Sequence, residues 1–226
     1  MDYEELEEQR RKAWSATSTS RCEYIIPKVI HQIWLGDQSK RPNTLMQTWI
    51  DKNPTWEYKL WTEANLPELQ CKEQFDAMQQ LNGKADILRY EILFNEGGFY
   101  IDADSKALEP LDDFLLDNDS FCCWENEYVR TGLMACGYLG ATKGNTLMET
   151  LVEKIKAYST SDMETLAWLT VGPQLLTDVV KLLEYSKLTI YPSWYFIPKH
   201  YTGVTYEGSG KVYGEQYFMS TGGDHY

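Results

Sequence analysis

The sequence predicts an α/β fold in which helices flank a largely parallel or mixed central sheet. Short apolar strands alternate with longer helical segments along the chain, a pattern typical of sheets covered by helices. The chain has 226 residues, of which 43% are hydrophobic, so it can bury a substantial core. No internal repeat or low-complexity segment is visible. We therefore expect a single domain over residues 25–226, preceded by a polar arm or helix at 1–24.

Turn and capping residues mark the elements of the first hundred residues. Residues 28–35 are apolar and β-branched, which predicts a strand, and residues 56–61 alternate as a half-exposed strand does. Thr62 is a good helix N-cap, and Gly97 is a good C-terminal cap for the helical run before it. In chain order we expect a strand at 28–35, a helix at 42–52, a strand at 56–61, a helical region at 62–81 with a break near 67, a helix at 84–95 and a strand at 99–101.

The second half of the chain continues this alternation. Pro173 fits the first turn of a helix, where the amide hydrogen that proline lacks would have no partner. In chain order we expect a short helix at 111–116, strands at 120–124 and 133–139, helices at 145–158 and 173–185, a strand at 188–191, and then an aromatic, glycine-rich tail.

The chain is strongly acidic, with a net charge of -13 and a pI of about 4.7. This charge argues against nucleic acid and anionic membrane surfaces as partners. No stretch reaches the roughly 18–20 apolar residues of a transmembrane helix, and residues 1–20 lack the apolar centre of a secretory signal. The five cysteines are odd in number and form no Cys-x-x-Cys pair, so they indicate neither a zinc site nor a disulfide framework. We expect a cytoplasmic protein, in the host cytoplasm if the source is a virus.

Two carboxylates stand one residue apart at the end of a predicted strand. Asp102 and Asp104 follow residues 97–101, where a Gly-Gly turn leads into a short apolar strand. Residues i and i+2 of an extended chain point to the same side, so both carboxylates project together. Like charges this close repel unless a proton or a cation lies between them. A divalent metal that carries a diphosphate would supply the cation, at the sheet edge where ligands of α/β folds bind.

The bare Asp-x-Asp motif is a weak signal, because roughly one arises by chance in a chain of this composition. A second pair, Asp117 and Asp119, lies in a polar turn without a preceding strand, and we expect it to be a solvated loop. Only the first pair follows a helix, a Gly-Gly turn and an apolar strand, and this context favours it.

Other candidate residues lie near the same predicted sheet edge. Asp86 and Arg89 share one helix face, where they form either a surface ion pair of little consequence or a pair that binds a sugar hydroxyl and a phosphate. Trp34 ends the first strand, where its ring either packs in the core or stacks on a nucleobase. His31 on the same strand is expected to be a hydrogen-bonded core histidine rather than a ligand.

Four ordered segments carry these residues: PKVIHQIWLG at 27–36, KADILRY at 84–90, GGFYIDAD at 97–104 and PLD at 110–112. Together they closely resemble the DXD-containing sugar-binding region of the Och1-like glycosyltransferases. That family includes fungal initiating α-mannosyltransferases and inositol-phosphoceramide mannosyltransferases, and its skeleton is also found in the clostridial glucosylating toxins. The resemblance spans about residues 25–180 and includes a later VGPQ element at 171–174.

The resemblance implies a GT-A fold and a metal-dependent glycosyltransferase. Such an enzyme moves a hexose-type sugar from a UDP- or GDP-sugar to an acceptor hydroxyl on a glycan, lipid or protein, with retention of configuration. By position in the motifs, Trp34 would stack on the base, Asp86 and Arg89 would hold the sugar and diphosphate, and Tyr100 would lie beside the nucleotide.

The resemblance also implies Mn²⁺ or Mg²⁺. Asp104 would bind the metal directly, and Asp102 would contact the ribose or donor sugar beside it. With Arg89 they form the expected catalytic set, in which the metal and the guanidinium neutralise the departing diphosphate. Family members commonly add a histidine near the metal; His225 or Asp224 takes that place here, although the match is poor.

The acceptor side is less defined. Glu125 and Glu127 follow a predicted strand and are either acceptor-site carboxylates or part of a charged loop. The aromatic tail at 194–217 either shapes the acceptor side or packs internally.

Two rival classes remain open. Haloacid-dehalogenase-type phosphatases also place Asp-x-Asp after an apolar strand, but near the N-terminus and with Thr or Val where this chain has Lys106. A non-catalytic nucleotide- or carbohydrate-binding module would fit the same motifs, although an inactive relative would usually lose one of the two aspartates.

Overall fold

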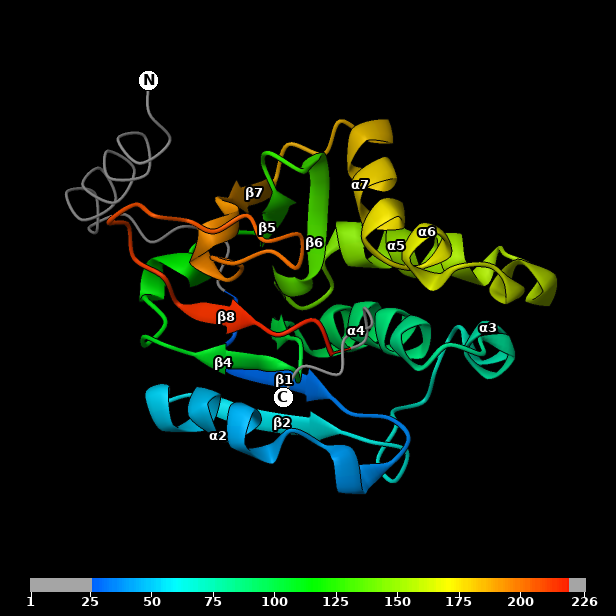
Figure 1. The fold of residues 1–226 in the computed structure, drawn as a ribbon. Helices are drawn as coiled ribbons and strands as arrows, with labels where there is room; N and C mark the ends of the chain where they lie inside the picture. The colour runs from blue at the N-terminus through cyan, green and yellow to red at the C-terminus, as the bar shows by residue number, and fades with distance from the viewer. Residues whose placement is uncertain (1–25, 220–226) are drawn as a thin grey trace.

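A computed structural model describes residues 26–219, built around a six-stranded mixed sheet with the strand order β2-β1-β3-β6-β5-β7 (Figure 1). Every neighbouring pair is parallel except the two pairs that contain β6. The strands are β1 (Val29–Ile33), β2 (Glu57–Trp61), β3 (Gly98–Ile101), β5 (Ser120–Asn126), β6 (Arg130–Ala141) and β7 (Leu188–Tyr191). The expected α/β fold with a mixed central sheet is confirmed. The expected arm at 1–24 lies outside the described residues.

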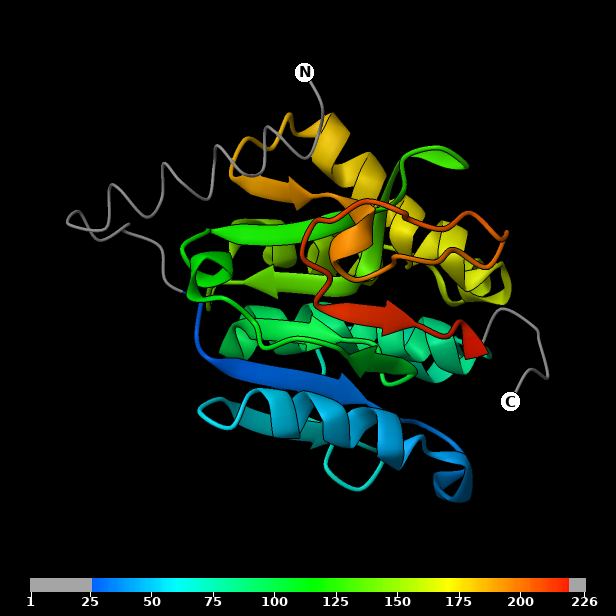
Figure 2. The ribbon, with the colours of Figure 1, turned by 60° about the vertical axis from the view of Figure 1, so that its left-hand side comes forward.

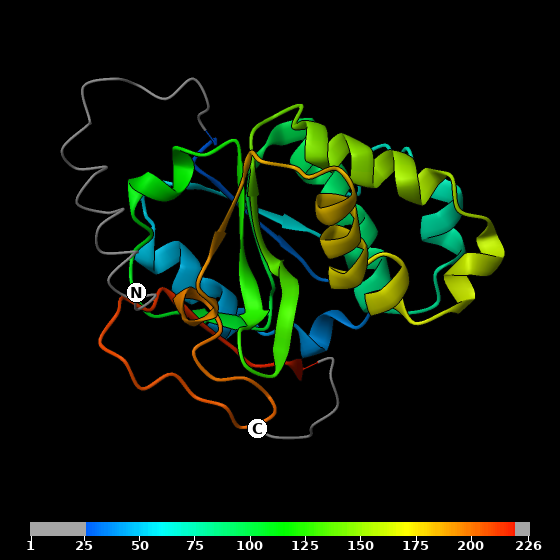
Figure 3. The same cartoon turned by 90° about the horizontal axis from the view of Figure 1, so that it is seen from above.

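Helices lie on both sides of this sheet, as the view from above shows (Figure 3). One side carries α3 (Lys72–Ala77), α4 (Leu81–Glu96), α5 (Thr146–Lys156), α6 (Ala167–Thr170) and α7 (Pro173–Leu182). The other side carries α2 (Asn43–Lys52) and a two-stranded antiparallel ribbon, β4 (Ser105–Ala107) with β8 (Gly214–Gln216), seen side by side in Figure 2. Short 3-10 turns are η1 (Gln38–Lys40), η2 (Asp113–Leu116), η3 (Thr160–Glu164) and η4 (Ser193–Tyr195).

The sheet separates two hydrophobic cores, because successive side chains of a strand point to opposite faces. On β3, Tyr100 belongs to the core under α4, α5 and α7, whereas Phe99 and Ile101 belong to the core on the opposite face. The second core is aromatic: the Phe99 ring lies 4.9 Å from Phe121 and 5.4 Å from Phe196. Much of the aromatic tail therefore packs internally, with Tyr195, Phe196 and Tyr213 buried in this core.

A glycine pair connects α4 to β3 and fixes where the strand begins. Gly97 ends α4 with φ +70, a left-handed conformation that glycine adopts without strain. Gly98 has φ +108, and a Cβ there would lie 2.8 Å from His31 Nε2. Only glycine lets the chain turn this closely against β1. The turn sets where β3 begins, and β3 then ends beside the carboxyl end of β1. The expected C-terminal cap at Gly97 is confirmed.

The helical region predicted at 62–81 is wrong. Residues after Thr62 form a turn in which the Thr62 amide donates to Asn65 Oδ1 at 2.8 Å, and Pro67 supplies no amide hydrogen to continue a helix. Helix α3 occupies only six residues, and α4 starts three residues earlier than expected. The short elements β4, α6 and β8 were not predicted, because three or four residues are too few to show a period.

His31 is the buried core histidine that the sequence suggested. Trp61 Nε1 donates to its Nδ1 at 3.1 Å, so Nε2 carries the ring hydrogen and donates to the Gly97 carbonyl at 2.8 Å. Burial lowers the pKa of His31 below its ordinary value of 6.5. The ring therefore serves the fold, by tying β1 and β2 to the Gly-Gly turn.

We predict that His31 makes the folded state less stable in acid. Below pH 6.5 the His31 side chain takes up a proton in the unfolded chain but not in the folded chain. The free energy of unfolding therefore decreases as the pH is lowered toward the folded-state pKa, by up to about 1.4 kcal/mol per pH unit. Urea unfolding at pH 7.5 and pH 5.5 tests this. The loss between these values should be larger for the wild type than for His31→Gln, and equal losses would contradict the assignment.

In residues 26–219, no helix is both long enough and apolar enough to span a membrane.

Candidate active site

An open cavity of about 860 Å³ lies at the carboxyl ends of β1, β3 and β5. This volume falls within the roughly 300–1,000 Å³ that small-molecule sites usually occupy. The cavity also lies where open α/β folds bind ligands, beyond the carboxyl ends of the strands. The lining includes all six donor-side residues that the sequence nominated: Trp34, Asp86, Arg89, Tyr100, Asp102 and Asp104.

Arg89 on α4 contacts both Asp86 on the same helix and Asp102 at the end of β3. Its Nη2 lies 3.0 Å from Asp86 Oδ1 and 3.3 Å from Asp102 Oδ1, and its guanidinium stacks 4.3 Å from the centre of the Tyr100 ring. The Tyr100 hydroxyl donates to the same Asp102 oxygen at 2.9 Å. Asp86 and Arg89 are only 5% and 4% exposed, so the surface-ion-pair alternative is wrong.

Burial perturbs the charged groups of this cluster and leaves two donors of Arg89 without a partner in the described part of the chain. Burial raises the pKa of Asp86 to about 6, against the opposing effect of the Arg89 charge. Arg89 Nε and Nη1 are buried, yet neither has a hydrogen-bond partner in the described part of the chain. Buried donors without partners are costly. An anionic ligand in the cavity would give them acceptors.

The backbone of Asp102 is held from three directions. Its amide donates to the Gly137 carbonyl at 2.9 Å, and its carbonyl accepts from Gln32 Nε2 at 3.2 Å and Ser105 Oγ at 2.7 Å. Gly137 on β6 also makes room for the carboxylate, because a Cβ there would lie 2.3 Å from Asp102 Oδ2. The strand end is thus a fixed platform for this carboxylate.

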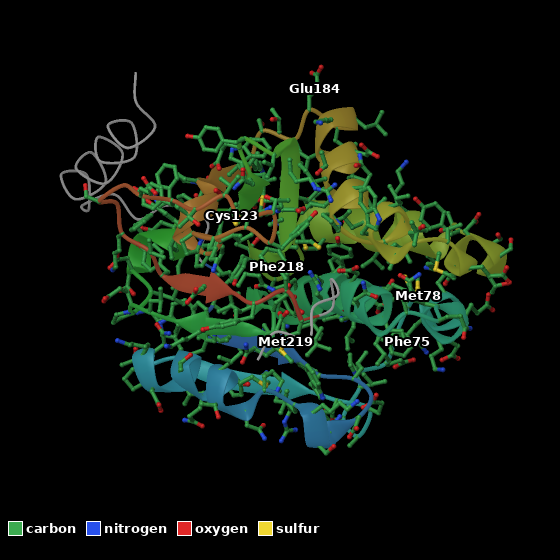
Figure 4. All side chains as sticks on the ribbon, in the orientation of Figure 1. Phe75, Met78, Cys123, Glu184, Phe218 and Met219 are labelled. Atoms are coloured by element: carbon green, nitrogen blue, oxygen red, sulfur yellow. The ribbon has the colours of Figure 1, made fainter. Side chains whose placement is uncertain are left out.

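Asp104 is held by the last residue of β8 and by the segment that follows it. Its Oδ1 accepts from Gln216 Nε2 at 2.8 Å, and its Oδ2 accepts from the Met219 amide at 2.7 Å. Phe218 and Met219, labelled in Figure 4, continue this segment along the cavity wall. Burial, and then the nearby Asp102 charge, raise the pKa of Asp104 to about 6.

The contact with Gln216 was not anticipated. Gln216 also accepts from the Tyr138 hydroxyl at 2.7 Å, so it links β6 to the Asp-x-Asp pair. Its strand has three residues and lies more than 100 residues from Asp104, and no sequence pattern marks it.

Trp34 lies half-buried on the wall of the cavity, with its indole Nε1 donating to the Asp37 carbonyl at 3.0 Å. Its amide donates to the Trp61 carbonyl, which extends the β1–β2 pairing to the cavity edge. The ring is therefore fixed beside open space rather than enclosed in either core.

The other acidic candidates separate clearly. Glu125 lines the cavity, whereas Glu127 accepts from the amide and hydroxyl of Ser193 and helps to hold η4.

The expectation that Asp117 and Asp119 form a merely solvated loop is wrong for Asp119. Its Oδ2 accepts from the Tyr185 hydroxyl at 2.6 Å and from Asn145 Nδ2 at 2.9 Å, so the turn anchors the start of α5 and the segment that follows α7.

Metal-ligating residues are few in the described range, 26–219. No group of three or more His, Cys, Asp and Glu side chains is arranged there to hold a metal ion. Asp102 and Asp104 supply two carboxylates at one strand end. His225 and Asp224 lie outside the described residues.

The fold is that of the GT-A type glycosyltransferase domains. The PaToxG glycosyltransferase aligns with a TM-score of 0.56 and 17% identity over 77% of this chain and 75% of that one. The UDP-bound glycosyltransferase domain from the YGT toxin gives 0.55 and 10% identity, over 74% and 80% of the two chains. The catalytic domain of alpha-toxin from Clostridium novyi gives 0.54 and 10% identity, over 80% and 68%.

Residues 39–121 match the family model described as glycosyltransferase sugar-binding region containing DXD motif. Inositol phosphoceramide mannosyltransferase 3 of Schizosaccharomyces pombe is 27% identical over 147 residues, which are 59% of this chain and 38% of that protein. Initiation-specific alpha-1,6-mannosyltransferase of Candida albicans is 31% identical over 127 residues, or 48% and 31% of the two chains. The resemblance to Och1-like glycosyltransferases is confirmed, and the chain spans about a third of the length of these relatives.

Proposed function

We propose that this chain is a metal-dependent glycosyltransferase that moves a hexose-type sugar from a nucleotide-diphosphate donor to an acceptor hydroxyl. One observation carries the proposal: side chains from β1, α4 and β3 line one cavity around a buried arginine with two unpartnered donors. The matched sugar-binding region and the GT-A fold agree with it.

The proposed donor lies across the ends of the first three strands. Trp34 stacks on the base at the β1 end, and Tyr100 supports the guanidinium of Arg89 beside the diphosphate. Arg89 Nε and Nη1 give the phosphate oxygens the charge-assisted donors that a guanidinium provides. Asp86 and Asp102 accept hydrogen bonds from hydroxyls of the sugar or ribose. Either a UDP- or a GDP-sugar meets these requirements, and the UDP-bound toxin domain favours UDP.

The residues present fit a hard divalent cation. Carboxylate oxygens are the ligands that Mn²⁺ and Mg²⁺ prefer, and such ions commonly keep waters and substrate phosphates in their remaining positions. The repulsion between Asp102 and Asp104, which contributes to the raised pKa of Asp104, is what a cation between them would relieve. Asp104 is the proposed direct ligand, with Asp102 beside it. When bound, the ion would neutralise charge on the departing diphosphate.

The chain's own residues would then bind and orient the reactants. The bond between the anomeric carbon and the diphosphate oxygen breaks, and its electron pair leaves with the diphosphate. The acceptor oxygen bonds to the anomeric carbon from the same side, and its proton passes to a departing phosphate oxygen. Arg89 stabilises the developing charge at close range. This course gives retention of configuration.

Turnover of a donor panel tests the proposal. Purified protein is incubated with UDP- and GDP-hexoses and either MnCl₂ or EDTA, and release of the nucleoside diphosphate is followed. We expect release from at least one donor with Mn²⁺ and none with EDTA. Binding of a donor without any release would favour the non-catalytic module, and release of inorganic phosphate from phosphomonoesters instead would favour a phosphatase.

We predict that Gly137→Ala lowers donor turnover although it adds only a methyl group. The new Cβ would meet the Asp102 carboxylate, which would have to rotate away from Tyr100 and Arg89. Misplacing a binding group by about 1 Å costs up to roughly a hundredfold, and we expect a loss of at least tenfold. Thr131→Ala, at an exposed position on the same strand, is the control. Equal turnover in both variants and the wild type would contradict this role of Gly137.

We also propose that residues 25–226 act as one catalytic domain in a reducing compartment such as the cytoplasm. All four cysteines in the described range are free and buried, which agrees with a reducing environment.

A further inference from the structure

A second cluster of polar and aromatic side chains lines the cavity away from Trp34. Glu125 lies near the end of β5, and Arg130 begins β6 across the same hairpin. Strands β3 and β6 separate β5 from β1 in the sheet, so the ends of β1 and β5 lie about 14 Å apart. The Asp-x-Asp pair follows β3, between these ends. The cluster therefore lies on the opposite side of the proposed metal site from the proposed base.

The Glu125 carboxylate is held in place by a buried histidine. The Thr202 amide donates to His200 Nδ1 at 3.4 Å, so Nε2 carries the ring hydrogen and donates to Glu125 Oε1 at 3.2 Å. Arg130 Nε lies 3.7 Å from the same oxygen. His200 is fully buried, whereas the Glu125 side chain reaches the cavity wall. Both contacts are made to Oε1, which leaves Oε2 to accept from a ligand.

Arg130 organises exposed rings beside this carboxylate. Its guanidinium lies 5.6 Å from the centre of the Trp168 ring and 6.0 Å from that of Tyr201, and its Nη2 donates to the Tyr201 hydroxyl at 2.5 Å. The Phe218 ring lies 5.2 Å from Tyr201. Trp168 and Tyr201 are 39% and 44% exposed although both line the cavity. Exposed rings gathered on the wall of one cavity are typical of a ligand-binding groove.

We propose that this Glu125–Arg130–Trp168–Tyr201 cluster is the acceptor subsite and that the acceptor is a carbohydrate; the inference rests on the function proposed above. A sugar presents an apolar C–H face and a rim of hydroxyls. This cluster offers a partly exposed indole with a guanidinium over one of its faces, and a fixed carboxylate beside that guanidinium. The carboxylate accepts from a sugar hydroxyl, and Arg130 donates to another. A net charge of -13 opposes an anionic lipid surface as the acceptor.

The subsite binds and orients the acceptor without taking part in bond cleavage. With Glu125 and Trp168 fixing the sugar ring, one hydroxyl faces the anomeric carbon of the donor. Bond formation and proton transfer to the departing phosphate oxygen proceed as described above. Loss of the subsite should therefore raise the acceptor KM and leave donor hydrolysis in the absence of acceptor unchanged.

The test compares Glu125→Gln and Trp168→Ala with two exposed neighbours, Glu164→Gln and Leu169→Ala. Transfer is measured to methyl glycosides of mannose, glucose, galactose and N-acetylglucosamine, and to serine- and tyrosine-containing peptides. We expect the acceptor KM to rise about tenfold to a hundredfold for Glu125→Gln and about threefold to tenfold for Trp168→Ala. Donor hydrolysis without acceptor should stay within about twofold of the wild type in all four variants.

Saturation-transfer NMR of the same glycosides, with Mn²⁺ and the nucleoside diphosphate of the best donor present, measures acceptor binding independently of turnover. A signal that is lost in Trp168→Ala and kept in Leu169→Ala supports the subsite. Two results would overturn the subsite: no signal from any glycoside, or transfer to peptides that both cluster variants leave unchanged. Donor hydrolysis by the wild type would still support the glycosyltransferase proposal in either case. If the wild type itself hydrolyses no donor, the proposed function is refuted instead.

Discussion

Replacing Asp102 and Asp104 together by asparagine should reduce donor turnover by about a thousandfold or more, because it removes both carboxylates proposed to hold the cation. Stability should not fall in parallel. Asparagine keeps the shape of both side chains, and the change removes the repulsion that contributes to the raised pKa of Asp104. The change also removes the carboxylate charge beside Arg89 and turns an amide toward one of the two donors that Asp104 accepts from, so we expect at most a small loss of Tm. Turnover of the best donor with Mn²⁺ and a thermal melt of the same sample measure both quantities.

The second Asp-x-Asp pair is a matched control for this variant. Asp117→Asn with Asp119→Asn makes the same chemical change away from the cavity. It should preserve turnover and lower the Tm, because Asp119 accepts from Tyr185 and Asn145. If the first double variant keeps wild-type turnover, neither Asp102 nor Asp104 holds a cation that the reaction needs.

Replacing Arg89 by methionine should abolish turnover and also destabilise the fold. The variant leaves Asp86 buried without its cationic partner, and breaking a buried ion pair costs about 3–5 kcal/mol. It also removes the two unpartnered donors proposed to bind the diphosphate. Urea unfolding and donor turnover should therefore both show large losses.

A second variant separates these two effects. Asp86→Asn combined with Arg89→Met removes the uncompensated charge, so most of the unfolding free energy should return. Turnover should stay lost, because the guanidinium is still absent. A double variant that regains wild-type turnover would show that Arg89 serves only the fold.

The sequence predicted that these residues meet at one cavity, because they lie at strand ends or on one helix face. The period of α4 places Asp86 and Arg89 together, and the Gly-Gly turn places Asp102 at the end of β3. The mixed sheet was likewise predicted from the alternation of strands and helices. Each of these features depends on neighbours that are close in the chain.

The remainder depends on contacts between distant segments, which no local pattern reveals. Gln216 meets Asp104 through a three-residue strand, and His200 meets Glu125 from a loop 75 residues away. Gly137 opposes Asp102 only because β3 pairs with β6. The predicted helix at 62–81 failed for a related reason: its apolar residues pack under α4 and α5 without a continuous helical period.

Isothermal titration with UDP and GDP, each in the presence of MnCl₂ and then of EDTA, measures whether the cavity binds a nucleotide through a metal ion. We expect that at least one of the two nucleotides binds with Mn²⁺ and that EDTA weakens its binding by about tenfold or more. We further expect that Asp102→Asn with Asp104→Asn binds no better with Mn²⁺ than with EDTA. Absence of binding by both nucleotides, or binding that EDTA leaves unchanged, would contradict a metal-dependent nucleotide-sugar site at the end of β3.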